Sequence, residues 1–240
     1  MPKHLSVSSL NFFLTFPEAW YYRYIVGVKD FQTTPSMLTG IAVHEGVAAV
    51  LNGRKYEPVI KEAIRKEGES LEQEDQELAE QEATRLMEGY VEDGPYFEPL
   101  HIELAGEYEI RHPKTGEPLP LPFNYRMDLI TTDNLLVDHK TTRYKMTKSQ
   151  DWQYKNQGVA YWMLYEEMMG KEPDYFVENQ IVKTKTPQYH QRFFRYDEQN
   201  KIEFWELARE AIDKIEKEQW YGRPMRKTFY PNPLAHLCAK

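Results

Sequence analysis

The chain has 240 residues, of which 41% are hydrophobic and 14% aromatic, a composition that predicts a globular protein with one substantial core. Its single cysteine, Cys238, excludes an intrachain disulfide and an all-cysteine metal site. The apolar runs are far shorter than the roughly 20 residues of a membrane-spanning helix, and the first residues lack a basic and then apolar leader. We therefore expect a soluble, cytoplasmic protein, and a bacterial or phage source would fit it.

The net charge is -8, from 30 Lys and Arg residues against 38 Asp and Glu residues. Nucleic-acid phosphates are held by Lys and Arg, so this balance argues at first against a nucleic-acid partner. Much of the acidic excess, however, lies in one block between Lys61 and Asp93, and the remaining chain is nearly balanced or locally basic. We interpret this block as the solvated face of surface helices.

The first hundred residues have helical periodicity. A helix is predicted to begin with Ser8 and Ser9 as caps, and a second aromatic-rich run begins at Pro17. Residues 36–51 predict another helix with one apolar face, and residues 61–90 predict one or two amphipathic surface helices.

After Pro99 the pattern changes to alternation of polar and apolar residues, which is typical of strands. The expected elements are strands over 101–111, 123–131 and 135–141, a helix over 149–170, strands over 174–183 and 189–196, and a closing helix over 198–220. No repeat or linker divides the chain. We expect one domain over 1–240, with a mainly helical part over 1–98, a core over 99–220 and a tail over 221–240.

One strand pair carries the residues with chemical potential. Asp128 and Asp138 are predicted on the two strands of a tight hairpin, and Lys140 shares a strand face with Asp138. Two carboxylates and an ammonium group in an apolar setting are costly unless a metal ion or a partner compensates the charge. Oxygen ligands suit Mg²⁺ or Mn²⁺, and such a site favours phosphodiester hydrolysis. An Asp-x-Lys pair alone, however, is also common on ordinary exposed strands.

Several motifs, in order, resemble the RecB and AddB type branch of the PD-(D/E)XK nucleases, which is related to the CRISPR-associated iron-sulfur exonucleases. Residues 6–24 are similar to the family's opening helix, and residues 40–44 match its G-x-x-x-H motif. Asp128 stands where the family has G-x-x-D, residues 137–142 match D-x-K-T, and residues 157–161 match Q-x-x-x-Y. The resemblance implies a mixed α/β (α+β) fold with a restriction-endonuclease-like core, in which helices flank a central mixed β-sheet, and an N-terminal helical region.

The resemblance also implies a site that holds one or two Mg²⁺ or Mn²⁺ ions. The implied ligands are His44, Asp128, Asp138 and the backbone carbonyl of His139. Lys140 would be catalytic, assisted by Gln157 and Tyr161, which lie one helical turn apart and so share a face.

Two points about this site stay open in the sequence. A family glutamate on the strand before the aspartate corresponds to either Glu107 or Glu109. His44 could also be a core or surface residue of its helix, although Gly40 one turn earlier would allow a close backbone approach. The side chain of His139 is expected to point away from Asp138.

The chain departs from its iron-sulfur relatives. Those proteins carry four cysteines that bind a cluster, whereas here Phe16 stands in place of the first and only Cys238 remains near the end. We therefore expect no iron-sulfur cluster, with packing around Phe16 in its place. Tyr125 replaces the glycine of G-x-x-D and adds bulk beside Asp128.

The expected substrate is DNA, with ends or single strands favoured. The candidate DNA contacts, each of which could also be an ordinary surface charge or core aromatic, are Arg126, Arg143, Lys145, Lys148, Lys155 and Trp152. No base-reading motif is visible, so we expect an exonuclease of recombination, repair or phage DNA processing, with a recombination or replication protein as a candidate partner. The alternatives are a site-specific or structure-specific endonuclease and a catalytically silent DNA-binding or assembly subunit. The sequence indicates no oligomeric state.

Overall fold

The computed structural model describes residues 2–28, 33–147 and 151–220, with the backbone alone for 151–154. The N-terminal part is helical, as expected, and its elements are α1 (Val7–Thr15), α2 (Pro17–Tyr21), a π-helical turn η1 (Tyr22–Val26), α3 (Pro35–Leu51), α4 (Glu57–Glu67) and α5 (Gln73–Asp93). Lys148 and the predicted tail over 221–240 lie outside the described residues.

Helix α1 begins earlier than the sequence suggested. Its N-cap is Ser6, whose side-chain oxygen accepts a hydrogen bond of 3.1 Å from the backbone N–H of Ser9. The predicted caps Ser8 and Ser9 lie inside the helix instead, and the hydroxyl of Ser9 accepts a hydrogen bond from the indole of Trp20. The prediction that Ser8 and Ser9 cap this helix is therefore wrong, because the capping side chain accepts a hydrogen bond from the backbone N–H three residues further along the chain.

The second half forms one five-stranded sheet in the order β1-β2-β3-β4-β5. Its strands are β1 (Pro99–Tyr108), β2 (Phe123–Thr131), β3 (Leu135–Thr142), β4 (Tyr175–Val182) and β5 (Gln188–Phe194). Strands β3 and β4 are parallel and the other neighbours are antiparallel. A parallel pair needs a crossover, which here is α6 (Asp151–Met169). The expected mixed sheet is thereby confirmed.

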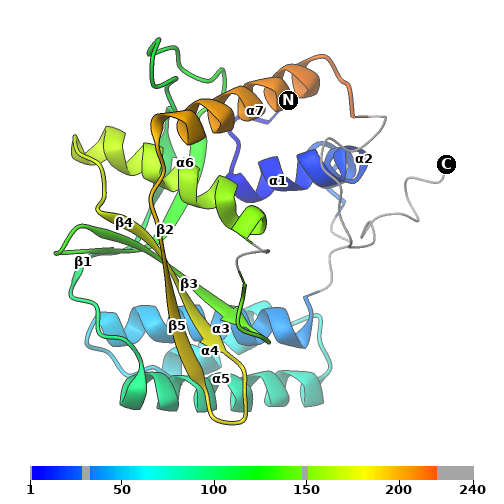
Figure 1. Cartoon of the computed structure of the whole chain (residues 1–240). Coiled ribbons are helices and arrows are strands. Elements are labelled where there is room, and N and C mark those ends of the chain that lie inside the picture. The colour runs from blue at the N-terminus through cyan, green and yellow to red at the C-terminus, as the bar shows by residue number, and fades with distance from the viewer. Residues whose placement is uncertain (1, 29–32, 148–150, 221–240) are drawn as a thin grey trace.

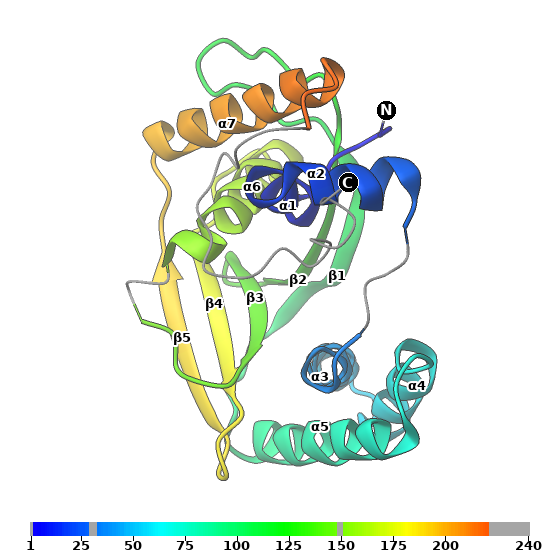
Figure 2. The same ribbon diagram turned by 90° about the vertical axis from the view of Figure 1, so that its right-hand side faces the viewer.

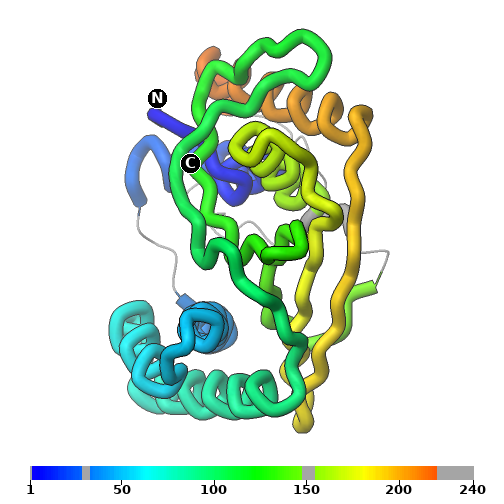
Figure 3. Tube along the Cα trace, turned by 90° about the vertical axis from the view of Figure 1, so that its left-hand side faces the viewer, coloured from blue at the N-terminus to red at the C-terminus, as the bar shows by residue number. Residues whose placement is uncertain are grey.

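Helices cover the sheet from two sides (Figures 1 and 2). Helices α1, α6 and the closing helix α7 (Glu198–Glu216) lie on one side, and α3, α4 and α5 lie on the other. Figure 3 shows the long strands of the sheet running between these two groups of helices. The arrangement brings α3 and α6, which carry His44 and Gln157, to opposite sides of β3.

Each side has its own apolar core. Phe13, Trp162 and Phe176 belong to the larger cluster, which joins α1, α6 and α7 to the sheet. Leu38 and Leu86 belong to a second cluster, which joins α3, α4 and α5 to β4. None of the helices in the described residues is long and apolar enough to cross a membrane.

Aromatic packing connects the two ends of the described chain. The ring of Tyr21 stacks on that of Trp220 at 4.8 Å, and Phe16 lies 5.8 Å from Phe12 between ring centroids. Helix α7 ends at Glu216, four residues before its predicted end at Trp220. Trp220 therefore lies beyond α7, where its ring contacts Tyr21 at the end of α2.

Gly158 lets α6 approach the segment after β5. A Cβ atom at this position would lie 2.0 Å from the hydroxyl oxygen of Tyr196, whose ring packs against Trp162, Phe176 and Phe194. Gly40 in α3 is the opposite case, because a Cβ there would meet no described atom within 4 Å. The close approach expected at Gly40 is thus absent from the described structure.

We predict that Gly158→Ala destabilises the protein by about 1–3 kcal/mol through overpacking. Gly40→Ala is the matched control and should be neutral or more stable by up to about 1 kcal/mol, since alanine is the better helix former. Urea unfolding followed by circular dichroism measures both changes. Equal stabilities for the two variants would contradict the packing described for α6.

Candidate active site

The sheet register places three carboxylates on neighbouring strands. Ile102 pairs with Leu129 and Leu104 with Met127, so Glu103 of β1 lies opposite Asp128 of β2. Strands β2 and β3 pair at Leu129 with Val137 and at Ile130 with Leu136, so Asp128 and Asp138 directly follow the last pair of this ladder. The predicted hairpin of β2 and β3 is therefore present, and β1 adds a third acidic residue beside Asp128.

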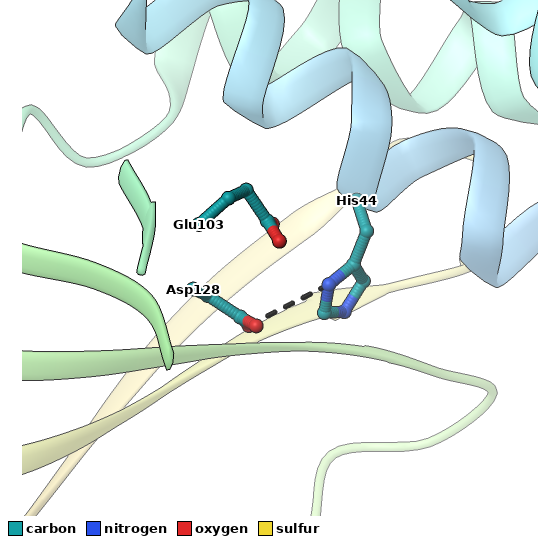
Figure 4. Close-up of side chains that lie close together, drawn as sticks. All are labelled: His44, Glu103 and Asp128. Carbon is teal, nitrogen blue, oxygen red and sulfur yellow. Dashed lines mark ion pairs between the residues drawn. The ribbon is translucent and has the colours of Figure 1, made fainter. Parts of the chain in front are cut away.

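Glu103, Asp128 and His44 form a compact group of possible metal ligands. One ligand atom from each lies within 4.8 Å of the other two. The Nδ1 atom of His44 is 3.5 Å from Oδ2 of Asp128. Figure 4 shows His44 descending from α3 toward both carboxylates, which come from the sheet. The helix and the hairpin thus meet as the sequence suggested.

Asp128 is held by the backbone of the next strand. Its Oδ2 atom accepts a hydrogen bond of 2.7 Å from the N–H of His139. A carboxylate that accepts a hydrogen bond from a backbone N–H is fixed in direction. The same oxygen faces His44, so β3 aims the Asp128 carboxylate at α3.

Asp138 has a different environment from Asp128. Its side chain is 3% exposed, and its Oδ2 atom lies 2.7 Å from Nζ of Lys140. Gln157 of α6 bridges the pair, donating to Oδ1 of Asp138 at 2.7 Å and accepting from Lys140 Nζ at 2.9 Å. The structure therefore pairs Asp138 with Lys140 and Gln157, and the group of His44, Glu103 and Asp128 lies beside this triad.

Tyr161 is one turn after Gln157 on α6. Its hydroxyl donates a hydrogen bond of 2.8 Å to the backbone carbonyl of Arg126, and burial raises the pKa of Tyr161 to about 12. The phenol is thus protonated at neutral pH and fixes the backbone of β2 two residues before Asp128. This contact attaches α6 to the strand that carries the ligand.

Arg126 is the cation next to the group of ligands. Its guanidinium forms ion pairs with Glu103 and, at 3.1 Å, with Glu45 of α3. Burial raises the pKa of Glu103, while the hydrogen bond from Arg126 opposes that rise. Since Arg126 is itself well exposed, its side chain can leave Glu103 without breaking the core.

The side chain of His139 points away from Asp138, as expected, and lies on the face of the sheet that α3 covers. Burial lowers the pKa of His139 to about 4, so its ring is neutral, and its Nδ1 atom is 2.9 Å from Nδ2 of Asn179. Its ring also lies 6.3 Å from that of His44. The ring of His139 therefore packs beside that of His44. Ligation by the backbone carbonyl of His139 stays a prediction.

Neither of the two expected glutamates lies in the site. Glu107 forms an ion pair with His4 at 3.0 Å, and Glu109 forms one with Arg111. Glu103 takes the position beside Asp128, with a left-handed backbone (φ 53°) just after an irregular pairing between Pro99 and His101. Alternation along β1 places Glu103 and Glu107 on the same face and so does not show which of them lies beside Asp128. The register of β1 against β2 shows that it is Glu103.

The candidate DNA contacts differ in their surroundings. Lys155 forms an ion pair of 3.0 Å with Glu203, and Arg143 lies 5.4 Å from the ring centroid of Tyr144. Lys145 is exposed near them. Lys148 and the side chain of Trp152 lie outside the described residues. Within the described set, Arg126 is the candidate that directly contacts a residue of the ligand group.

The group of ligands fits a divalent cation. It offers one imidazole nitrogen and two carboxylates, with Asp138 on the next strand. Mixed nitrogen and oxygen donors of this kind are compatible with Mg²⁺ and, more readily, with Mn²⁺. In the structure Arg126 supplies the positive charge that such an ion would supply to Glu103.

We predict that Mn²⁺ raises the melting temperature of the protein, since a ligand of the folded state stabilises it. Arg126→Gln should tighten Mn²⁺ binding by about fivefold to tenfold, because the guanidinium no longer competes for Glu103. Titration of the melting temperature with Mn²⁺ in the absence of DNA measures the change. Arg65→Gln, which removes an exposed pair with Glu62, is the control and should bind Mn²⁺ like the wild type. Weaker Mn²⁺ binding by Arg126→Gln would contradict this competition.

Comparisons with known proteins show the family and the fold of the chain. Residues 4–239 match the model of a family described as the PD-(D/E)XK nuclease superfamily. The chain is similar to the crystal structure of a "putative exonuclease" from Eubacterium rectale, with a TM-score of 0.61 and 16% identity, covering 99% of this chain and 93% of that one. No match was found among curated proteins. With a family match over nearly its whole length, the chain belongs to the PD-(D/E)XK nuclease superfamily, which implies a hydrolase acting on nucleic acid.

Proposed function

We propose that the protein is a Mg²⁺- or Mn²⁺-dependent deoxyribonuclease of the RecB and AddB type branch, and that it acts as an exonuclease. The observation that carries the proposal is the meeting of two groups on β2 and β3. His44, Glu103 and Asp128 offer ligands within 4.8 Å of one another, and Asp138 with Lys140 lies on the adjacent strand. A protein that only binds DNA has no need for this concentration of charge.

His44, Glu103, Asp128 and Asp138 would hold the metal, together with the backbone carbonyl of His139. When bound, the metal supplies an acidified water and stabilises negative charge on the phosphate. The His139 N–H keeps one oxygen of Asp128 in place throughout. Of the four side chains, Glu103 is held by an exposed cation and is therefore free to exchange that cation for the ion.

Lys140 would act on the phosphate or on the attacking water. Its ammonium group is held at 2.7 Å from Asp138 and 2.9 Å from the Gln157 oxygen, which limits it to one direction. A positive charge in a partly buried position offsets the charge that develops on the phosphate more strongly than one in water. Gln157 is then a positioning residue, because it contacts both members of the ion pair, and Tyr161 positions the strand backbone.

We predict that Lys140→Ala and Asp138→Asn each reduce Mn²⁺-dependent degradation of linear DNA by about a thousandfold or more, as loss of a central catalytic group does. Lys114→Ala is the control, since that lysine pairs with Glu198 at the surface. Far-ultraviolet circular dichroism checks that each variant is folded. Undiminished cleavage by folded Lys140→Ala would remove the assignment.

The exonuclease proposal is supported by two indirect observations. The similar protein from Eubacterium rectale is described as a "putative exonuclease", and the sequence has no base-reading motif such as a zinc finger. The alternatives are a structure-specific or site-specific endonuclease and a silent DNA-binding subunit.

End-labelled single-stranded, double-stranded and closed circular DNA, each incubated with the protein and Mn²⁺, separate these alternatives. We expect degradation of the linear substrates alone, with release of short products. Discrete fragments from circular DNA would show an endonuclease. Binding without cleavage would show a silent subunit.

A further inference from the structure

A pocket opens beside Lys140, between α1 and the start of β2. Its volume is about 400 Å³, within the range of sites that hold small molecules. The polar and charged side chains that line it include Ser8, Asn11, Asn124, Arg126, Lys140 and Gln157. It is a separate space from the group of His44, Glu103 and Asp128, none of which lines it.

The lining of this pocket has an unusual charge. The chain has eight more acidic than basic residues, yet the described lining holds two cations and no carboxylate. Hydroxyl and amide groups make up most of its other polar surface. Such a set can donate hydrogen bonds to an anion, and each cation is also paired with carboxylates that lie outside the lining.

Two cations connect the pocket to the candidate active site. Lys140 lines the pocket and is paired with Asp138, and Arg126 lines it and is paired with Glu103. An anionic chain whose reacting phosphate lies at Lys140 would therefore have its next unit at this pocket. The side chain of Asn11 is oriented by a hydrogen bond of 2.7 Å, in which its Oδ1 atom accepts from Nδ2 of Asn156. Its NH₂ group can then donate to a bound anion.

We propose that this pocket is the subsite for the sugar-phosphate unit adjacent to the scissile phosphate of a single nucleic-acid strand. The inference rests on the proposed function, and it assigns a binding role to α1 and the start of β2. The pocket is of a size for one nucleotide unit, and contacts made by amides and hydroxyls to phosphate and sugar carry no base sequence. The subsite therefore favours a strand of any sequence.

Ser8→Asp tests the subsite with little risk to the fold. Ser8 is exposed in the first turn of α1, where a negative charge stabilises a helix. Asn124→Asp is the second variant, an isosteric change of an exposed residue on the opposite wall. Ser70→Asp is the matched control, because Ser70 is exposed between α4 and α5 and does not line the pocket.

The affinity for a short, fluorescein-labelled single-stranded DNA is measured by fluorescence anisotropy in EDTA, so no cleavage or metal is involved. We expect Ser8→Asp and Asn124→Asp each to weaken binding on the order of tenfold, through repulsion of phosphate. Ser70→Asp should bind like the wild type, and melting temperatures should show that all variants are folded.

Wild-type affinity in both Ser8→Asp and Asn124→Asp would overturn the subsite, and so would an equal loss in Ser70→Asp or a wild type that does not bind the strand. If Ser8→Asp lowers the melting temperature, Asn124→Asp decides. Because the assay contains no metal, failure of the nuclease proposal is recognised separately, as DNA that is bound normally but not cut with Mn²⁺.

Discussion

A row of acidic residues across the sheet is the constraint on which the rest of the structure depends. Four neighbouring strands contribute Glu103, Asp128, Asp138 and Glu178, of which Asp138 and Glu178 are paired across β3 and β4. Burial raises the pKa of both Glu103 and Glu178, and the nearby carboxylates of Asp128 and Asp138 respectively add to this rise. Each of the four therefore has a cation or an imidazole beside it, and the respective partners are Arg126, His44, Lys140 and Arg192. Packing of α3 and α6 serves this row, since α3 brings His44 and α6 brings the amide that orients Lys140.

The cations that neutralise these carboxylates differ in burial, and this difference gives the carboxylates different roles. Asp138 and Lys140 form a nearly buried ion pair, which stabilises a fold less than apolar residues of similar volume would. Its retention in the core is therefore better explained by function than by stability. Glu103 is compensated by an exposed guanidinium that can be exchanged. The part of the row nearest to α3 can thus accept a mobile cation, while the part nearest to α6 keeps a fixed one.

The sequence predicted those features that depend on local spacing. Residues two apart on a strand share a face, so the relation of Asp138 to Lys140 was fixed by spacing, and the order of helices and strands followed from periodicity. Glu103 was missed because its place depends on how β1 aligns with β2 and on an irregular pairing near Pro99, which no spacing within β1 reveals. Likewise, the partners of Arg126 lie on α3 and β1, far from it in the chain. Ligation by the His139 carbonyl and the division of the chain at residue 98 remain predictions.

Net charge misleads for this protein because the acidic residues are segregated. Many of them are on α5, which Figure 2 shows on the far side of the molecule from α1. Charges separated by more than the Debye length, about 8 Å at physiological ionic strength, are largely screened from each other. A phosphate beside Lys140 would therefore experience the local lining, which has cations and amides, far more than the acidic helix. The acidic residues of α5 would repel nucleic acid from the side of the molecule that α5 covers. The net negative charge, which in the sequence argues against a nucleic-acid partner, would then favour approach from the side of α1.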